Sequence, residues 1–292
     1  MSGRKEGLSE PVARTGAGEE RALFLFAFLD GKTALAPEWT ERDPFPPPAI
    51  TRFGAVAALF SMVPVAEYCG REPERDLSNS DWLLRRTLYH AALLRRAMRS
   101  SPIYPVPFGT LFWSLESLRI FIRTHEERIG AFLQRVAGME EWELKAEAGF
   151  SSVAALEALA LSLHPDWSRL PPGTRYMRLC RERAALLAAG FERAERGAAE
   201  LLETLNPTAL RRLLAAPAES GGEDRWGARF ALLVPAEEAD VFQEKVERLA
   251  GEAAACGVAL ALSGPWPPFS FRPDLPAPKV PGETAMAPIC PQ

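Results

Sequence analysis

The sequence predicts an α+β protein made of two domains. Three observations support this prediction: an uninterrupted apolar run near the N-terminus, long segments with helical periodicity, and a strand-helix-strand-strand-helix-strand order in the second half. The length of 292 residues allows two domains of roughly 100–150 residues each. We expect an N-terminal α+β domain at 21–138 and a C-terminal domain at 139–272. A disordered lead-in at 1–20 and a Pro-rich tail at 273–292 flank them.

The composition is that of a globular protein, with 47% hydrophobic and 25% charged residues and a formal net charge of −4. This mild acidity disfavours nucleic-acid binding, which usually shows a strongly basic domain. The longest apolar run, Ala22–Leu29, is far shorter than the about 20 residues that span a membrane. The N-terminus lacks the apolar core of a signal peptide, so we expect a cytoplasmic protein that does not enter a lipid membrane.

The first domain begins with a buried strand at Arg21–Leu29. Pro37–Pro48 is a loop, because proline lacks the N–H and fixes φ. Ile50–Val63 follows as one or two strands broken near Gly54. Next comes a helix at Ser78–Ser101, capped by Ser78 or Asn79, whose core face is predicted to be Leu84, Leu88 and Ala92, with Tyr89 and Leu93 beside them.

The prolines of Ile103–Phe112 keep that segment extended. A second helix is expected at Ser114–Val136, with Gly138 as its C-terminal cap. Its predicted core stripe is Leu118, Phe121, Ile122, His125, Ile129, Phe132, Leu133 and Val136.

The second domain opens with Glu141–Ala148, a half-buried strand with Trp142, Leu144, Ala146 and Ala148 on one face. A short Ala/Leu-rich helix precedes a long helix at about Thr174–Leu205. The stripe of that long helix is predicted to be Tyr176, Leu179, Cys180, Leu187, Phe191, Ala194, Ala198, Leu201 and Leu205.

Ala209–Ala216 reads as a weak strand or a continued helix, and Arg225–Val234 as a clear strand. A helix then opens at Pro235 and ends near Gly257, and a last strand holds Val258, Leu260 and Leu262. The resulting β-α-β-β-α-β order is typical of the ferredoxin-like arrangement.

The sequence offers no pattern for catalysis, for a cofactor or for a metal. The four cysteines contain no CxxC pair, and the three histidines have no paired metal spacing. We expect His90 and His125 to pack, with His125 hydrogen-bonded on its helix stripe, and His164 to have no role. The nucleophile elbow and the phosphate-binding loops are also missing, so we expect no catalytic, cofactor or metal residues and no enzyme.

Two segments are candidates for partner contacts. The first is a cluster of arginines in the first turns of the long helix, where the helix dipole disfavours cations: Arg175, Arg178, Arg181 and Arg183. They form either a solvated face paired with Glu182 or a contact with acidic groups of a partner or of the other domain. In Ser263–Phe271, three prolines hold Trp266, Phe269 and Phe271 on an extended chain. These rings either dock on the protein's own sheet or interdomain groove, or they contact a partner.

Four stretches together resemble the gas vesicle protein F/L (GvpF/GvpL) family. They are Ile103–Phe112, which contains ProPheGlyThrLeuPhe, Gly138–Lys145, Pro172–Arg183, and Ser263–Phe271 with SerGlyProTrpProProPheSerPhe. The resemblance spans about Arg21 to Arg272. Two positions depart from the family pattern: Pro107 stands where a basic residue is usual, and Ala91 stands where an acidic residue commonly follows His90.

The resemblance implies two α+β domains, the second ferredoxin-like, and a non-enzymatic role in forming the gas vesicles that provide buoyancy. It implies an accessory or minor structural protein, associated with the vesicle, whose partners are the small hydrophobic shell protein and other accessory proteins. A sheet edge or an apolar groove could hold such a subunit by strand addition or by helix packing. We place this surface around Tyr104, Phe108 and Phe112. Further partner candidates are Trp266, Phe269 and Phe271, which support the interdomain groove, and Arg178 and Arg181.

Two other functions remain open from the sequence. A ferredoxin-like regulatory module that binds a small ligand is the second hypothesis, and it rests on the fold alone. An enzyme is the third.

Overall fold

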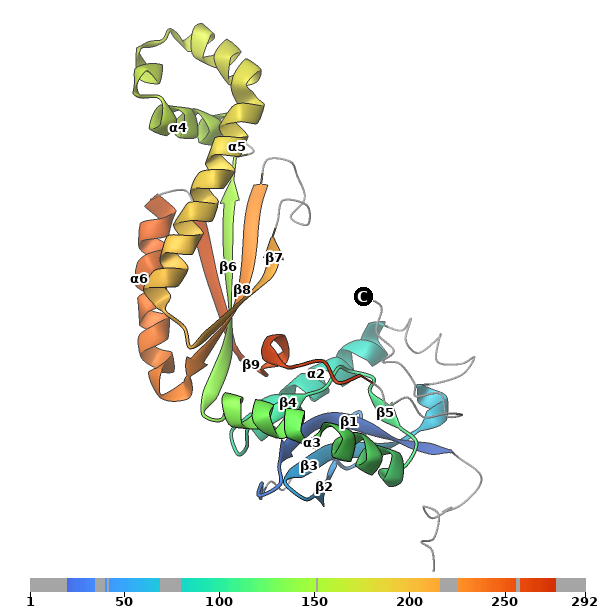
Figure 1. The fold of residues 1–292 in the computed structure, drawn as a ribbon. Coiled ribbons are helices and arrows are strands. Elements are labelled where there is room, and N and C mark those ends of the chain that lie inside the picture. Colours follow the sequence, from blue (N-terminus) through green and yellow to red (C-terminus); the bar gives the residue numbers. More distant parts are fainter. Residues whose placement is uncertain are drawn as a thin grey trace, which may run out of the picture. The chain divides into compact units, whose positions relative to one another are not determined.

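The computed structural model describes residues 20–34, 40, 42–68, 80–150, 152–215, 225–255 and 258–276. The chain divides into two compact units, drawn in Figure 1: unit 1, Met1–Ala137 with Arg272–Gln292, and unit 2, Gly138–Phe271. Each unit holds one antiparallel sheet with helices, so the predicted α+β class is confirmed. Of the predicted lead-in and tail, residues 1–19 and 277–292 lie outside the described residues.

The sheet of unit 1 is built around its first strand. Strands β1 (Arg21–Asp30), β2 (Ala49–Phe53), β3 (Val56–Pro64) and β4 (Ile103–Pro105) stand in the order β2-β3-β1-β4, and β5 (Leu111–Phe112) also pairs with β1. Residues 22–29 are all buried, which explains the uninterrupted apolar run. The break expected near Gly54 is confirmed, because this glycine joins β2 to β3 with a φ of +72°.

A bulge in β1 changes which of its residues point to each face of the sheet. The register with β3 shifts between Leu25 and Ala27, so Phe24 and Leu29 join one core cluster while Phe28 lies with Phe121 on the other side. Helix α2 (Ser80–Met98) contributes to the first cluster. Helix α3 (Leu115–Val136) supplies Phe121 to the second. The apolar sheet is therefore packed against helices on both faces.

The predicted core face of α2 is confirmed at Leu93, which is buried, and at Tyr89, which packs half-buried against the core, but it is wrong at Leu84, Leu88 and Ala92. Leu84 is 54% and Leu88 59% exposed, and Ala92 is also exposed, whereas the buried residues of this helix are His90, Leu93, Leu94 and Ala97. The helix carries apolar side chains on two nearly opposite faces, and periodicity alone cannot tell which one faces the sheet. The proposed caps, Ser78 and Asn79, lie outside the described residues.

Helix α3 agrees with its prediction. All of its predicted stripe is buried except Phe121, which is half-buried. Ser114 and Ser117 form a reciprocal capping box at its start. Gly138 follows the helix with a φ of +69°, the left-handed conformation expected of a glycine at this position.

Unit 2 has the predicted order of elements. It comprises β6 (Met139–Gly149), α4 (Val153–Leu163), the short η2 (Pro165–Arg169), α5 (Pro172–Leu205), β7 (Ala209–Ala215), β8 (Arg225–Pro235), the short η3 (Ala236–Glu238), α6 (Ala239–Ala255), β9 (Val258–Trp266) and the short η4 (Phe269–Phe271). The strands pair in the order β7-β8-β6-β9, all antiparallel. The ambiguous segment therefore forms a strand over Ala209–Ala215, and Ala216 lies outside the described residues.

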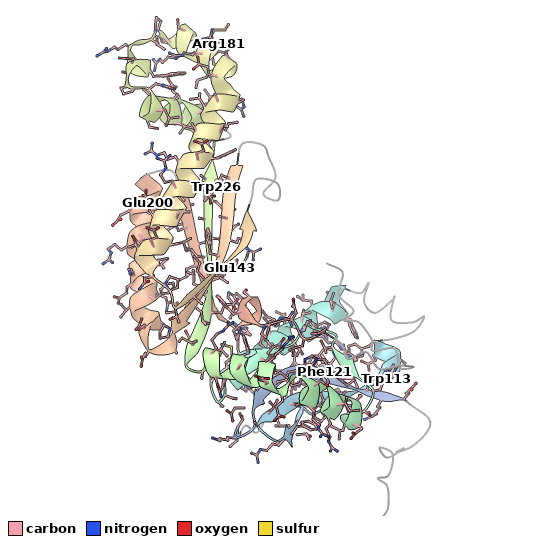
Figure 2. The ribbon with its side chains drawn as sticks, in the orientation of Figure 1. Trp113, Phe121, Glu143, Arg181, Glu200 and Trp226 are labelled. Atoms are coloured by element: carbon pink, nitrogen blue, oxygen red, sulfur yellow. The ribbon has the colours of Figure 1, made fainter. Side chains whose placement is uncertain are left out.

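One face of this sheet packs against α5 and α6, which lie on the same side of the strands in Figure 1. Trp142, Leu144, Ala146 and Ala148 point into this core, as their alternation predicted. Phe242 of α6 and the Trp226 labelled in Figure 2 belong to the same cluster.

The first half of α5 extends past the sheet and packs with α4 and η2. This second cluster contains Leu156, Leu159, Ala160, Trp167, Leu179, Leu186 and Leu187. The predicted stripe was wrong at Tyr176, which is 57% exposed, and at Cys180, which is also exposed. The first half of α5 packs against α4 and η2, whereas the second half packs against the sheet. The buried face of the first half is therefore rotated away from the stripe that was predicted for the whole helix.

Candidate interaction surfaces

In unit 1, exposed apolar side chains lie directly after β5 and on the first turns of α3. Trp113 and Ile120 are each 45% exposed. Phe112 and Phe121 are half-buried, with ring centroids 5.3 Å apart. We call these four residues the β5–α3 patch, and Figure 2 labels Trp113 and Phe121. Sequence reasoning included Phe112 but missed Trp113 and Ile120, although Trp113 directly follows the ProPheGlyThrLeuPhe motif.

Tyr104 is buried inside unit 1. Its ring packs edge-on against Phe132 at 5.1 Å and also lies beside Phe28. Burial raises the pKa of its hydroxyl to about 12. A side chain that is only 2% exposed offers no ring surface to a partner, so we do not retain Tyr104 as a partner contact.

Two hydrogen bonds join the segment Arg272–Pro276 to the rest of unit 1. The Tyr104 hydroxyl donates to the carbonyl of Pro273. A ring nitrogen of His125, Nε2, lies 2.9 Å from the carbonyl oxygen of Pro276. The expectation that His125 is a hydrogen-bonded histidine on the helix stripe is therefore confirmed.

Phe108 belongs to an aromatic cluster with His90. Its ring centroid lies 5.2 Å from that of Phe24 and 5.7 Å from that of His90. His90 is buried, and within the described part of the chain its Nε2 has no hydrogen-bond partner. Burial lowers the pKa of His90 to about 4, so the ring is neutral at pH 7 and packs as an aromatic group.

The segment Ser263–Phe271 folds back onto β6. The hydroxyl and the backbone N–H of Ser270 donate to the buried carboxylate of Glu141, at 2.6 and 3.1 Å. Gly264 lies so close to the sheet that an added Cβ would stand 2.8 Å from Trp142. Of the two explanations for this segment, docking on the protein's own sheet is therefore observed. Trp266 and Phe269 still remain 39% and 37% exposed, and Phe271 is half-buried.

Three arginines at the start of α5, Arg175, Arg178 and Arg181, have partners within unit 2. Arg175 donates to Glu157 of α4 at 2.8 Å, and Arg178 donates to Glu182 at 3.0 Å while lying over the Trp167 ring. The hydrogen bond from Arg178 lowers the pKa of Glu182. Arg181 also pairs with Glu182, but its side chain is 78% exposed. The predicted pairing with Glu182 is observed, and Figure 2 shows Arg181 on the part of α5 that packs with α4.

The described residues form no cluster of three or more side chains suited to a metal ion. In the same part of the chain, every helix is too short or too polar to cross a bilayer. Cys180 is exposed and free, whereas Cys69, Cys256 and Cys290 lie outside the described residues.

Comparison with known proteins places the chain in a family. A search of curated sequences finds no match. The crystal structure of the gas vesicle protein GvpF from Anabaena sp. PCC7120 superposes with a TM-score of 0.57 at 16% identity, covering 87% of this chain and 97% of that one. GvpF from Microcystis aeruginosa gives a TM-score of 0.59 at 14% identity, covering 86% and 99%. At such identities the likeness shows the fold. A family model described as gas vesicle synthesis protein GvpL/GvpF matches residues 22–273, and the chain belongs to this GvpL/GvpF family.

Proposed function

We propose that this protein supports gas vesicle formation by binding the small hydrophobic shell protein before or during its assembly. In this proposal it acts in the cytoplasm at the growing vesicle, without catalysis, as an accessory or minor structural component that also contacts other gas vesicle proteins. Family membership supports a gas vesicle role. The observation that carries the binding step is the exposure of Trp113, directly after the short edge strand β5, and of Ile120 on the first turns of α3.

Strand β5 is suited to adding another strand. Within the described sheet it pairs only with β1, so the opposite side of its backbone has no partner strand. A shell subunit that assembles through apolar surfaces is prone to aggregate until it is incorporated. An extended segment of that subunit would pair with the β5 backbone and cover the β5–α3 patch. Because these side chains are already about half buried, covering the rest of each would contribute roughly 1 kcal/mol.

We infer further that unit 2 is a ferredoxin-like domain. The β-α-β-β-α-β order, the strand order β7-β8-β6-β9 and the two helices on one face support this assignment. In the proposal, the exposed parts of Trp266 and Phe269, together with Phe271, and the exposed guanidinium of Arg181 extend the contact area for vesicle proteins. Arg178 acts by holding the α4–α5 pair in shape.

The test is a double substitution in the β5–α3 patch, Trp113→Glu with Ile120→Glu. Both side chains are about half exposed, so the variant should fold, and it should lose co-purification with the shell protein and reduce vesicle number under the electron microscope. Val241→Glu is the matched control, since Val241 is an exposed apolar residue of α6 in the other unit. Normal shell-protein binding and normal vesicles in the double variant would overturn the proposal.

A further inference from the structure

We propose that unit 2 has a second binding site, a groove between α5 and α6 that accepts an amphipathic α-helix of a partner protein. The helix would place its apolar stripe in the groove and its charged side chains on the rim. This site lies in a different unit from the β5–α3 patch, and the inference does not depend on the proposed binding of the shell protein.

The groove has the length to hold one face of a helix. Its volume is about 760 Å³, and one wall is the part of α5 from Gly190 to Thr204. At 1.5 Å per residue this wall is about 20 Å long, the length of a helix of roughly 14 residues. The opposite wall is formed by α6 around Leu249 and Ala253, and α4 lines one end. At the other end α5 and α6 meet, where Lys245 donates to the carbonyl of Thr204.

The floor of the groove is apolar. Ala194, Ala198, Leu201 and Val258 line it and belong to the buried core of the sheet. Leu249 and Leu260 pack against that core but are only partly buried. Part of this apolar surface is therefore open to a ligand in the groove, and burial of apolar area would drive binding.

Gly197 indicates that the described part of the chain does not fill this space. An added Cβ at Gly197 would meet no described heavy atom within 4 Å, although this residue lies inside α5 and lines the groove. A glycine inside a helix costs about 1 kcal/mol relative to alanine. At Gly190 the glycine is required, because an added Cβ would stand 2.8 Å from Leu159 of α4. At Gly197 its absent side chain instead leaves room for the backbone of another helix to approach closely.

The charges on the rim identify the kind of occupant. Arg196, Glu200 and Glu252 line the groove, and none of them makes an ion pair with another described residue, even though Arg196 and Glu200 are spaced i,i+4. Among the described residues, Arg193 donates only to the neutral hydroxyl of Ser162. An acyl chain could cover the apolar floor but could not satisfy both signs of charge. A helix with acidic side chains toward Arg193 and Arg196 and a basic one toward Glu200 satisfies both.

The experiment uses the full-length protein and a synthetic helical peptide as probe. The peptide is about 15 residues long, with a leucine stripe, two glutamates placed for Arg193 and Arg196, and one lysine placed for Glu200. Its binding is measured by fluorescence anisotropy. Gly197→Trp fills the groove and should weaken binding at least about tenfold. Gly251→Trp is the matched control, since Gly251 is a helical glycine of α6 that also faces open space but does not line the groove.

A charge swap tests the orientation of the helix. Arg193→Glu with Arg196→Glu should weaken the original peptide and favour a peptide whose two glutamates are replaced by lysines. The proposal is overturned if the matched peptide does not bind the wild-type protein, or if both tryptophan variants bind it equally. Tight binding of a fluorescent fatty acid that Gly197→Trp abolishes, without peptide binding, would assign the groove to an acyl ligand and overturn it too. The Trp113 and Ile120 variant should bind the peptide normally, so this proposal and the proposed function can fail separately.

Discussion

Glu143 of β6 and Arg229 of β8 lie diagonally across neighbouring strands, and the guanidinium donates two hydrogen bonds to the carboxylate, at 2.7 and 3.0 Å. Figure 2 labels Glu143 on the sheet of unit 2. The pair lies on the sheet face opposite the α5 and α6 core, since its neighbours Trp142 and Phe230 point into that core. It connects the two central strands of this sheet on the face away from α5 and α6.

We expect a modest stabilising coupling between these two residues. The Arg229 side chain is 41% exposed, so solvent screens the pair, but its two-bond geometry is favourable. A double-mutant cycle of Glu143→Gln and Arg229→Gln should give a coupling energy of about 0.5–1 kcal/mol from urea unfolding. The coupling should shrink in high salt. A coupling of zero at low salt would contradict this prediction.

Glu141 and Ser270 form the more consequential contact of unit 2. Ser270→Ala removes one of the two hydrogen bonds that Ser270 donates to the buried carboxylate, since the hydroxyl is lost while the backbone N–H still donates. We expect a loss of about 1–3 kcal/mol in the free energy of unfolding, because the lost bond goes to a buried charged group. Limited proteolysis should then cut after β9 sooner than in the wild type. Ser263→Ala is a control, because its hydroxyl accepts only from the exposed ring of Trp266. Equal stability of all three proteins would refute the role given to Glu141.

His90 should make unit 1 sensitive to acid. Its pKa is lowered to about 4 in the folded protein and is near 6.5 when unfolded, so its contribution to stability is complete above pH 6.5. As the pH falls from 6.5 to 4, the unfolded state binds the proton first, and up to roughly 3 kcal/mol is lost. His90→Phe should flatten this part of the stability curve, measured by urea unfolding between pH 4 and 7. Tyr89→Phe keeps His90 and should retain the wild-type slope. A persistent slope in His90→Phe would show that other groups cause it.

Two glycines of α5 should respond in opposite ways to alanine. Gly197→Ala has open space around the new methyl group and should stabilise the protein by about 0.5–1 kcal/mol, because alanine is the better helix former. Gly190→Ala places the methyl group 2.8 Å from Leu159 and 3.0 Å from Phe150, so it should destabilise by about 1–3 kcal/mol. Thermal unfolding of the two variants side by side is the measurement. Stabilisation by Gly190→Ala would mean that α4 can shift without loss.

Sequence patterns predicted the parts of the fold that local periodicity determines. The buried stripe of α3, the alternation of β6 and the continuous apolar β1 each depend on a spacing that the backbone geometry dictates. The stripe of α2 failed because Leu84 and Leu88 satisfy the same spacing as the residues that are buried. Choosing between them requires knowledge of the sheet on which the helix packs.

The candidate surfaces were harder to predict, because burial is set by residues far away in sequence. Tyr104 belongs to a conspicuous motif, yet it is covered in part by Pro273, 169 positions further along the chain. Phe108 is half-buried because Phe24 and His90 come together beneath it. The groove of unit 2 depends on how far α5 and α6 diverge, and no local pattern reports that distance.

The return of the chain from unit 2 to unit 1 has a consequence for synthesis. A ribosome makes the polypeptide from its N-terminus at about 5–20 residues per second, and domains usually fold in the order of their emergence. Here the partners of Tyr104 and His125 are the carbonyls of Pro273 and Pro276, which leave the ribosome only after every strand of unit 2 has been made. Unit 1, whose strands are translated first, is therefore completed last. A message truncated before codon 272 would yield a unit 1 that lacks its C-terminal segment.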